Sequence, residues 1–135
     1  MKSARWLFGV AAAFNFVVGF GLLFLRPWLA PILRLAPVAG TNLALVNLVG
    51  GFIILFGYAY ALIASDPVRY RVYIHLSALG KAMAFISVII PWLGGQVFWT
   101  LPALASVDVV FAVLFLLFLR RSGGQGEVSG RTPLS

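Results

Sequence analysis

Two long apolar stretches decide the fold of this chain, and each carries one charged residue near its middle. Residues 72–90 read VYIHLSALGKAMAFISVII and contain Lys81, and residues 100–119 read TLPALASVDVVFAVLFLLFL and contain Asp108. At a rise of 1.5 Å per residue, about 20 apolar helical residues cross a hydrocarbon core of about 30 Å. A charge at that depth costs about 2.5–3.5 kcal/mol on insertion scales and usually pairs inside the protein. The two stretches therefore predict membrane-spanning helices with a buried Lys81–Asp108 ion pair.

The positions of Lys81 and Asp108 within their stretches predict that the two side chains lie at matching depths. Lys81 comes nine residues after Val72, where its helix enters the membrane, and Asp108 comes eight residues after Thr100. The helical rise then places them about 13 and 12 Å inside opposite faces of a core about 30 Å thick. The short hairpin over residues 92–99 makes the two helices antiparallel neighbours, so the two side chains can meet.

Two further apolar stretches raise the number of expected membrane-spanning helices to four, which cover residues 6–25, 43–64, 67–90 and 100–119. Lys2 and Arg5 would also suit the start of a signal peptide. The apolar stretch that follows them is longer than the roughly 7–15 residues of such a peptide, so we expect a retained helix. Asp66 and Pro67 predict a tight turn after the second helix, because Asp66 can cap the third helix and Pro67 can take its first position.

The predicted fold class is all-α: an integral membrane bundle of four antiparallel, up-and-down helices over residues 1–121. The connection over residues 26–42 carries Pro27, Pro31 and Pro37. It fits a short interfacial helix lying on the bilayer and an extended proline-rich loop equally well. Residues 122–135 are rich in Gly and Ser and have little apolar surface to bury, so a disordered cytoplasmic tail is expected there.

The composition supports a membrane protein and excludes several functional classes. The 135 residues are 62% hydrophobic and 10% charged, with a mean hydropathy of +1.05, which leaves no room for a soluble catalytic domain. The chain has no cysteine, so disulfides, thiolate metal sites and a cysteine nucleophile are excluded. The net charge of +7 comes from the ends of the apolar stretches, which is typical of anchoring to anionic lipid headgroups. The lipid bilayer is therefore an expected partner, and nucleic acid is not.

The distribution of basic residues predicts the orientation in the membrane. The cations of one side are Lys2, Arg5, Arg69, Arg71, Arg120 and Arg121. The other side has only Arg26 and Arg34. Because Lys and Arg gather on the cytoplasmic side, both termini are expected in the cytoplasm, with the protein in a bacterial inner membrane. The four tyrosines, Tyr60 among them, fall toward the cytoplasmic end and are interpreted as an interface belt.

Polar residues near the middle of the membrane form the candidate site. They are Asn15, Asn47, Lys81 and Asp108. Small residues share a helix face with each of them, which is typical of helix contact faces in lipid and predicts that the polar side chains point inward. Two interpretations stay open. The cluster locks the helices together, or it binds the polar head of a lipophilic molecule or handles a proton.

No other pattern in the sequence indicates an enzyme, a metal site or a cofactor. His75 is the only histidine and has no carboxylate or second histidine at i+3 or i+4, so an interfacial, hydrogen-bonded side chain is expected. The glycine pairs lie in no phosphate-binding loop, and no serine lies in a G-x-S-x-G motif. We therefore expect a protein that is not an enzyme, with no catalytic residue, no metal and no cofactor.

Several short motifs resemble those of small bacterial four-helix membrane proteins. They are Phe14-Asn15 with Gly19, Gly57-Tyr58-Ala59-Tyr60 before Asp66-Pro67, Gly80-Lys81, and Asp108 before Phe111 and Phe115-Leu116. In size and helix count the chain resembles the DoxX-like membrane proteins, some of which are associated with quinone-linked sulfur oxidation. The resemblance implies a four-helix membrane fold. It matches no DoxX motif residue by residue, so it implies no site residue.

The leading expectation for function is a small membrane protein whose polar cluster organises the bundle or binds a lipophilic small molecule such as a quinone or a lipid. An alternative is a membrane-protein partner, as an accessory subunit of a redox or transport complex or a homo-oligomer, which lipid-facing stripes of small residues would favour. A third is a proton-coupled small transporter. The chain resembles small multidrug transporters in size, but those rely on a carboxylate in the first helix, where this chain has Asn15.

Overall fold

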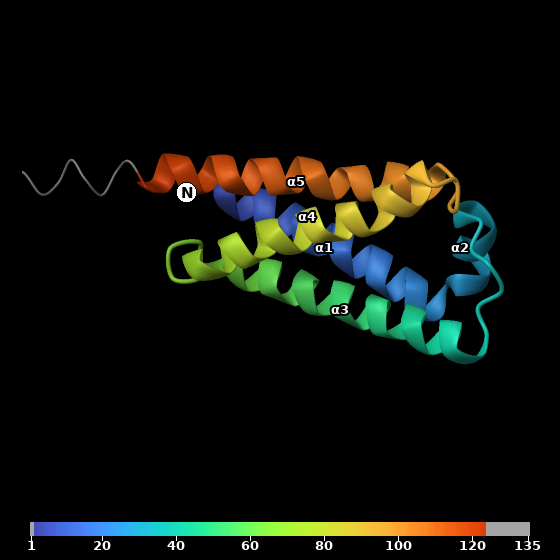
Figure 1. The fold of residues 1–135 in the computed structure, drawn as a ribbon. Coiled ribbons are helices and arrows are strands. Elements are labelled where there is room, and N and C mark those ends of the chain that lie inside the picture. Colours follow the sequence, from blue (N-terminus) through green and yellow to red (C-terminus); the bar gives the residue numbers. More distant parts are fainter. Residues whose placement is uncertain (1, 124–135) are drawn as a thin grey trace, which may run out of the picture.

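A computed structural model describes residues 2–123, which form five α-helices and no strand (Figure 1). In chain order the helices are α1 (Lys2–Phe24), α2 (Arg26–Leu33), α3 (Gly40–Ser65), α4 (Arg71–Leu93) and α5 (Thr100–Gly123). Four of them, α1, α3, α4 and α5, are long and apolar enough to cross a membrane. The predicted all-α bundle of four transmembrane helices is therefore confirmed.

Large apolar side chains cover the outer surface of the four long helices. Val17 on α1, Leu55 on α3, Leu79 on α4 and Val113 on α5 are all exposed. An apolar surface that continues around a bundle is unfavourable in water, whereas lipid tails solvate it. The outside of the bundle is therefore suited to contact with a lipid bilayer.

The four long helices pack as two antiparallel pairs. α1 lies along α3 and α4 lies along α5, whereas α3 and α4 meet near the turn that connects them and diverge toward α2 (Figure 1). Gly19 permits a close approach within the first pair. A Cβ atom on Gly19 would lie 3.0 Å from the Gly50 carbonyl oxygen and 3.2 Å from the Ile54 amide nitrogen. Any larger residue at position 19 would push the α1 and α3 backbones apart.

An aromatic core fills the bundle at the end where α1 begins and α5 ends. The Phe8 ring stacks on Phe115 with ring centroids 4.5 Å apart, and the Tyr60 ring lies 5.5 Å from Phe115. All three side chains are buried. At the same end, the Arg71 guanidinium donates a hydrogen bond of 3.4 Å to the Leu119 carbonyl and so connects the start of α4 to α5. This end of the bundle is tightly packed.

The turn between α3 and α4 is longer than the sequence predicted. The backbone N–H groups of Val68 and Arg69 donate to Asp66 Oδ1 at 3.2 and 3.0 Å. Asp66 thus closes a separate turn over residues 67–70, and α4 begins at Arg71. The predicted helix start at Pro67 is wrong, because an aspartate side chain that accepts two backbone N–H groups closes an isolated turn as readily as it caps a helix.

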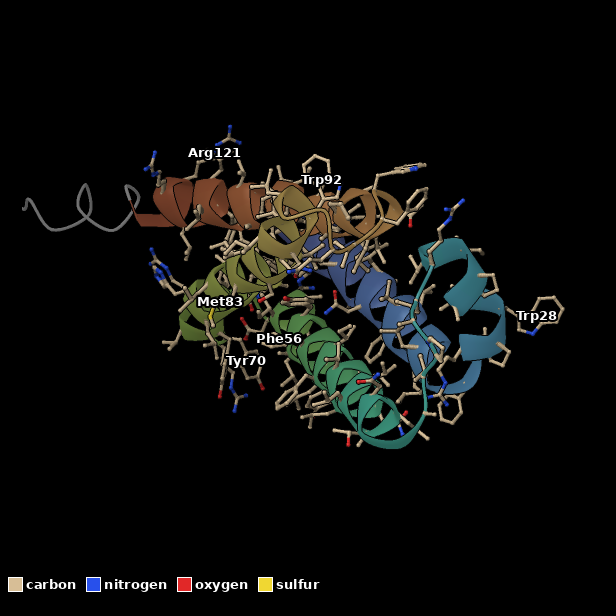
Figure 2. All side chains as sticks on the ribbon, turned by 45° about the vertical axis from the view of Figure 1, so that its right-hand side comes forward. Trp28, Phe56, Tyr70, Met83, Trp92 and Arg121 are labelled. Atoms are coloured by element: carbon tan, nitrogen blue, oxygen red, sulfur yellow. The ribbon has the colours of Figure 1, made fainter. Side chains whose placement is uncertain are left out.

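The connection between α1 and α3 contains the short helix α2, so the extended-loop interpretation is wrong for residues 26–33. Pro27 lies in the first turn of α2, where its missing N–H is tolerated. Trp28 is 78% exposed and projects from α2 away from the bundle (Figure 2), which suits an aromatic anchor at a membrane interface. α2 ends at Leu33, and the guanidinium of the next residue, Arg34, lies 4.0 Å from the centre of the Phe98 ring and connects α2 to the α4–α5 hairpin.

Both ends of the described chain lie at the same end of the bundle, opposite α2 (Figure 1). α5 continues to Gly123, two residues beyond the predicted domain boundary at residue 121. The remainder of the predicted disordered tail, residues 124–135, lies outside the described residues. Lys2 at the start of α1 and Arg121 near the end of α5 are both at this end. These two cations therefore lie on the same side of the bundle, as the sequence predicted.

Candidate functional site

The side chains of Lys81 on α4 and Asp108 on α5 form an ion pair, in which the ammonium donates to Asp108 Oδ1. The Lys81 side chain is 3% exposed and the Asp108 side chain is 20% exposed. The pair is therefore shielded from lipid, while part of the carboxylate stays accessible. The antiparallel hairpin brings the two charges together, as their matching depths predicted.

Asn15 connects this ion pair to the other two long helices. Its Oδ1 accepts a hydrogen bond of 3.2 Å from the Lys81 ammonium, and its Nδ2 donates a hydrogen bond of 3.1 Å to the Ile53 carbonyl of α3. The Asn15 side chain is buried. Asn15, Lys81 and Asp108 therefore form a polar cluster that links α1, α3, α4 and α5.

Three aromatic rings surround the Lys81 ammonium. Its Nζ lies 5.8 Å from the ring centre of Phe14, 5.1 Å from that of Tyr60 and 5.2 Å from that of Phe111. A cation over an aromatic face gains about 0.5–2 kcal/mol, with the larger values where water is excluded. The rings therefore help to keep a charged lysine inside the bundle.

The place of these aromatic residues at the site was not predicted from the sequence. Tyr60 was placed in an interface belt, yet it is 1% exposed and belongs to the core, so that placement is wrong. A signal for the other two was present. Phe14 adjoins Asn15 in the sequence, and Phe111 follows Asp108 by three residues, a spacing that puts Phe111 and Asp108 on the same helix face.

A cavity of about 570 Å³ lies beside the polar cluster. Asn15, Tyr60, Lys81 and Asp108 line one end of it. The wall from there toward α2 is apolar and includes Leu22, Leu33, Leu45, Leu101 and Leu104. The cavity is therefore polar near the middle of the bundle and apolar toward the α2 end.

The cavity is lined from both α3 and α4, the two helices that diverge toward α2 (Figure 1). Val49 and Phe52 on α3 and Met83 and Ser87 on α4 line the cavity and are also exposed on the outside of the bundle. Figure 2 shows Phe56 and Met83 on the same side of the bundle, from α3 and α4 respectively. These exposed lining residues are mostly apolar and belong to two helices that could span a membrane, so this side of the cavity is suited to contact with lipid.

Two polar groups beside the cavity keep hydrogen-bonding capacity that no described residue uses. Asp108 binds Lys81 through Oδ1, and no described residue donates to its Oδ2. The Tyr60 hydroxyl likewise has no hydrogen-bond partner among the described residues, although the side chain is buried. Both residues line the cavity. Thr100 Oγ1 is the one buried side-chain polar atom without a partner among the described residues, so Asp108 Oδ2 and the Tyr60 hydroxyl both have accessible surface and can bind a polar group inside the cavity.

The structure does not bring Asn47 to the polar cluster, so its predicted place there is wrong. Asn47 is exposed on α3, and its Oδ1 accepts a hydrogen bond of 3.2 Å from Arg26 at the α2 end of the bundle. Asn15 meets α3 at Ile53, and Asn47 lies six residues before Ile53, about 9 Å along α3 toward α2. Through its hydrogen bond with Arg26, Asn47 connects α3 to the start of α2.

His75 is exposed on α4 and does not line the cavity. Within residues 2–123, no group of three His, Cys, Asp or Glu side chains lies close enough together to hold a metal ion. The polar cluster itself offers hydrogen bonding and charge.

No protein-family model matches the chain, and no curated protein and no solved structure is detectably similar to it. The fold and the site define a class, a multi-pass α-helical membrane protein with a mostly apolar cavity beside a buried ion pair. The resemblance to DoxX-like proteins stays a prediction. What the chain does must be inferred from the cavity and the polar cluster.

Proposed function

We propose that this chain is a non-enzymatic membrane protein that binds a lipophilic small molecule, such as a quinone or a lipid, in the cavity beside Lys81 and Asp108. The polar head of the molecule lies at the polar cluster. Its apolar part lies along the apolar wall or leaves between α3 and α4 into the bilayer. The cavity volume of about 570 Å³ lies within the range of about 300–1,000 Å³ that is typical of small-molecule sites.

One observation carries this proposal: the cavity ends on Asp108 and Tyr60, each of which keeps an unused hydrogen-bonding position. An ion pair that only locked α4 to α5 would be expected to pack without a space beside it, because each methyl-sized void costs about 1 kcal/mol. Ala84 and Ala105 line the cavity near the pair, and their small side chains leave it open, whereas the Phe56 ring covers Gly80. These features favour a binding site over a purely structural lock.

We further propose a bacterial cytoplasmic membrane as the location, with both termini in the cytoplasm. The cations at the start of α1 and the end of α5, against Arg26 and Arg34 at the α2 end, support this orientation. In this orientation the cavity lies in the outer half of the bilayer, and α2 lies on its outer surface with Trp28 as an anchor.

A second candidate function is that of a subunit in a larger membrane complex, redox or transport, or in a homo-oligomer. A shallow depression on the outer face of α1 favours it, lined by Arg5, Trp6, Gly9, Val10 and Ala13. A Cβ atom on Gly9 would meet nothing within 4 Å, so packing within this chain does not require glycine there. Small residues four positions apart on a lipid-facing surface are typical of helix–helix contacts in membranes. Gly9→Leu should then abolish any association seen by analytical ultracentrifugation and leave the cavity unchanged.

Ser87→Trp and Ser106→Trp form a matched pair of variants for testing the proposed ligand binding. Both serines are exposed. Each hydroxyl donates to a carbonyl of its own helix, Ser87 to Met83 at 2.8 Å and Ser106 to Ala103 at 2.7 Å. Of the two, Ser87 lines the cavity and Ser106 does not. A tryptophan at position 87 takes up part of the cavity, whereas one at position 106 faces lipid.

Each protein would be purified in a mild detergent, and its bound lipophilic molecules would be extracted and quantified by mass spectrometry. We expect about one molecule of a single kind per chain for the wild type and for Ser106→Trp, and at least about tenfold less for Ser87→Trp, a loss of about 1.4 kcal/mol or more in binding. Equal content in all three proteins, or a mixture that matches the bulk membrane lipids, would contradict the proposal.

A further inference from the structure

The charges that border the cavity balance each other. Lys81 and Asp108 are the charged residues among those that line it, and they carry opposite charges in direct contact. The other polar residues of the lining are uncharged at neutral pH, namely Asn15, Tyr60 and Ser87. The site as a whole is therefore neutral.

A charged head group inside this cavity would have no counter-charge of its own. Lys81 already serves Asp108, and the apolar wall offers nothing in exchange for the lost hydration of a phosphate, a carboxylate or an ammonium. Burying an uncompensated ion in such surroundings is strongly unfavourable. An uncharged head loses only the hydration of its polar atoms, which hydrogen bonds to the protein can replace.

The polar cluster offers a ligand one donor and one acceptor. A lysine ammonium has three N–H donors, and Lys81 directs two of them to Asn15 and Asp108. One donor remains. Asp108 Oδ2 is the free acceptor, and the Tyr60 hydroxyl can act as a donor or as an acceptor. A head with an oxygen acceptor next to a hydroxyl donor would satisfy these groups together.

We propose that the cavity selects lipophilic molecules whose uncharged head carries both a hydroxyl donor and an oxygen acceptor. This inference rests on the proposed function and specifies its ligand. Two sources share this chemistry: a quinol, whose ring would lie against Phe14 and Tyr60, and a diacylglycerol, whose free hydroxyl lies beside an ester carbonyl. Phospholipids and fatty acids, whose heads carry charge, are rejected.

Binding of four probes to the full chain in a neutral detergent tests the selection by isothermal titration calorimetry. The neutral probes are a short-chain ubiquinol, kept reduced without oxygen, and dioctanoylglycerol. The charged probes are dioctanoyl phosphatidate, which differs from dioctanoylglycerol only in its head, and dodecylammonium. We expect at least one neutral probe to bind about tenfold or more tightly than either charged probe. Which neutral probe binds more tightly distinguishes the two sources.

Variants of the ion pair should change the preferred charge of the ligand. Asp108→Asn leaves Lys81 uncompensated and should shift the preference toward phosphatidate by about tenfold or more, and Lys81→Gln should shift it toward dodecylammonium by a similar factor. The double variant, Lys81→Gln with Asp108→Asn, is neutral again and should prefer a neutral probe. It strands no charge, so it serves as the test if a single variant fails to fold, as judged by circular dichroism.

Three outcomes separate this inference from the proposed function. A charged probe that binds the wild type as tightly as the better neutral probe would overturn the inference and leave ligand binding intact. If no probe binds but a lipophilic molecule co-purifies, the charge of its head group tests the inference. An uncharged head supports the inference, and a charged head overturns it. If no probe binds and nothing co-purifies, both the inference and the proposed function are wrong.

Discussion

Asn15 on α1 and Lys81 on α4 are joined by a hydrogen bond of 3.2 Å, although 66 positions separate them in the sequence. This bond connects the α1–α3 pair to the α4–α5 pair near the middle of the bundle. α3 and α4 diverge from their turn toward α2 (Figure 1), and all three residues of the polar cluster line the cavity. The same residues therefore join the two helix pairs and form the polar wall of the candidate site.

Loss of either partner of the ion pair should destabilise the protein. Lys81→Met and Asp108→Leu should each lower the free energy of unfolding by about 3–5 kcal/mol, because each strands the opposite charge inside the bundle. The double variant should regain most of that loss, since no charge remains. Unfolding in a denaturing detergent gives the coupling energy from the four proteins. Losses that simply add would show that the two side chains do not stabilise each other.

Asn15 and Asn47 allow the polar cluster to be compared with a polar contact on the surface. Asn15→Leu should cost about 1–2 kcal/mol, because it removes two hydrogen bonds of a buried side chain. Asn47→Leu makes the same chemical change at an exposed position with one hydrogen bond, to Arg26, and should cost less than about 0.5 kcal/mol. The free energies of unfolding of the two variants would be measured in the same detergent. Equal losses would mean that burial of Asn15 adds nothing to stability.

The depth of Lys81 and Asp108 could be predicted from the sequence, because helical rise converts spacing into depth and the hairpin fixes an antiparallel arrangement. The rotation of α3 about its own axis could not be predicted from the sequence. Gly50 and Gly51 are adjacent, and either could have faced α1. At about 100° per residue Asn47 lies closer to Gly51, which has open space around it, so Asn47 points outward. Rotation is decided by packing between helices, which a single sequence does not display.

The cavity and the role of Tyr60 also could not be predicted from the sequence. Distance from a helix end predicted the depth of Tyr60 but not the direction of its side chain, and the direction decides between a lipid interface and the core. The size of the cavity depends on how far α3 and α4 diverge past their contact at Phe56 and Gly80. Divergence is a property of the assembled bundle, because it follows from all the helix contacts together.

The close approach of α1 and α3 can be tested with two glycines. Gly19→Ala should destabilise the protein by about 1–3 kcal/mol, because the new Cβ lies 3.0 Å from the Gly50 carbonyl oxygen and the backbones must separate. Gly51→Ala is the control, since its Cβ would meet nothing within 4 Å. Its better helix propensity should leave stability unchanged or raise it by up to about 1 kcal/mol. The stability of both variants would be measured by thermal unfolding in detergent. Equal losses of stability for Gly19→Ala and Gly51→Ala would argue against the close contact.

The proposed orientation predicts where reporters fused to the chain become active. A fusion after Ser135 should report the cytoplasm, and an insertion in the exposed turn at residues 94–96 should report the outside. Alkaline phosphatase and green fluorescent protein give opposite signals on the two sides and serve as mutual controls. The reverse pattern would invert the orientation, and both reporters on one side would exclude four membrane crossings.

The central claim, that the cavity holds a lipophilic molecule by an uncharged head at the polar cluster, is tested most directly by nuclear Overhauser contacts between this protein and the neutral probe that binds more tightly. We predict contacts from head-group protons to the ring protons of Phe14 and Tyr60, which line the cavity, and none to Phe8, which is fully buried elsewhere. Contacts confined to the outward-facing rings of Phe20 and Phe24 would place the probe on the lipid-facing surface and contradict the claim.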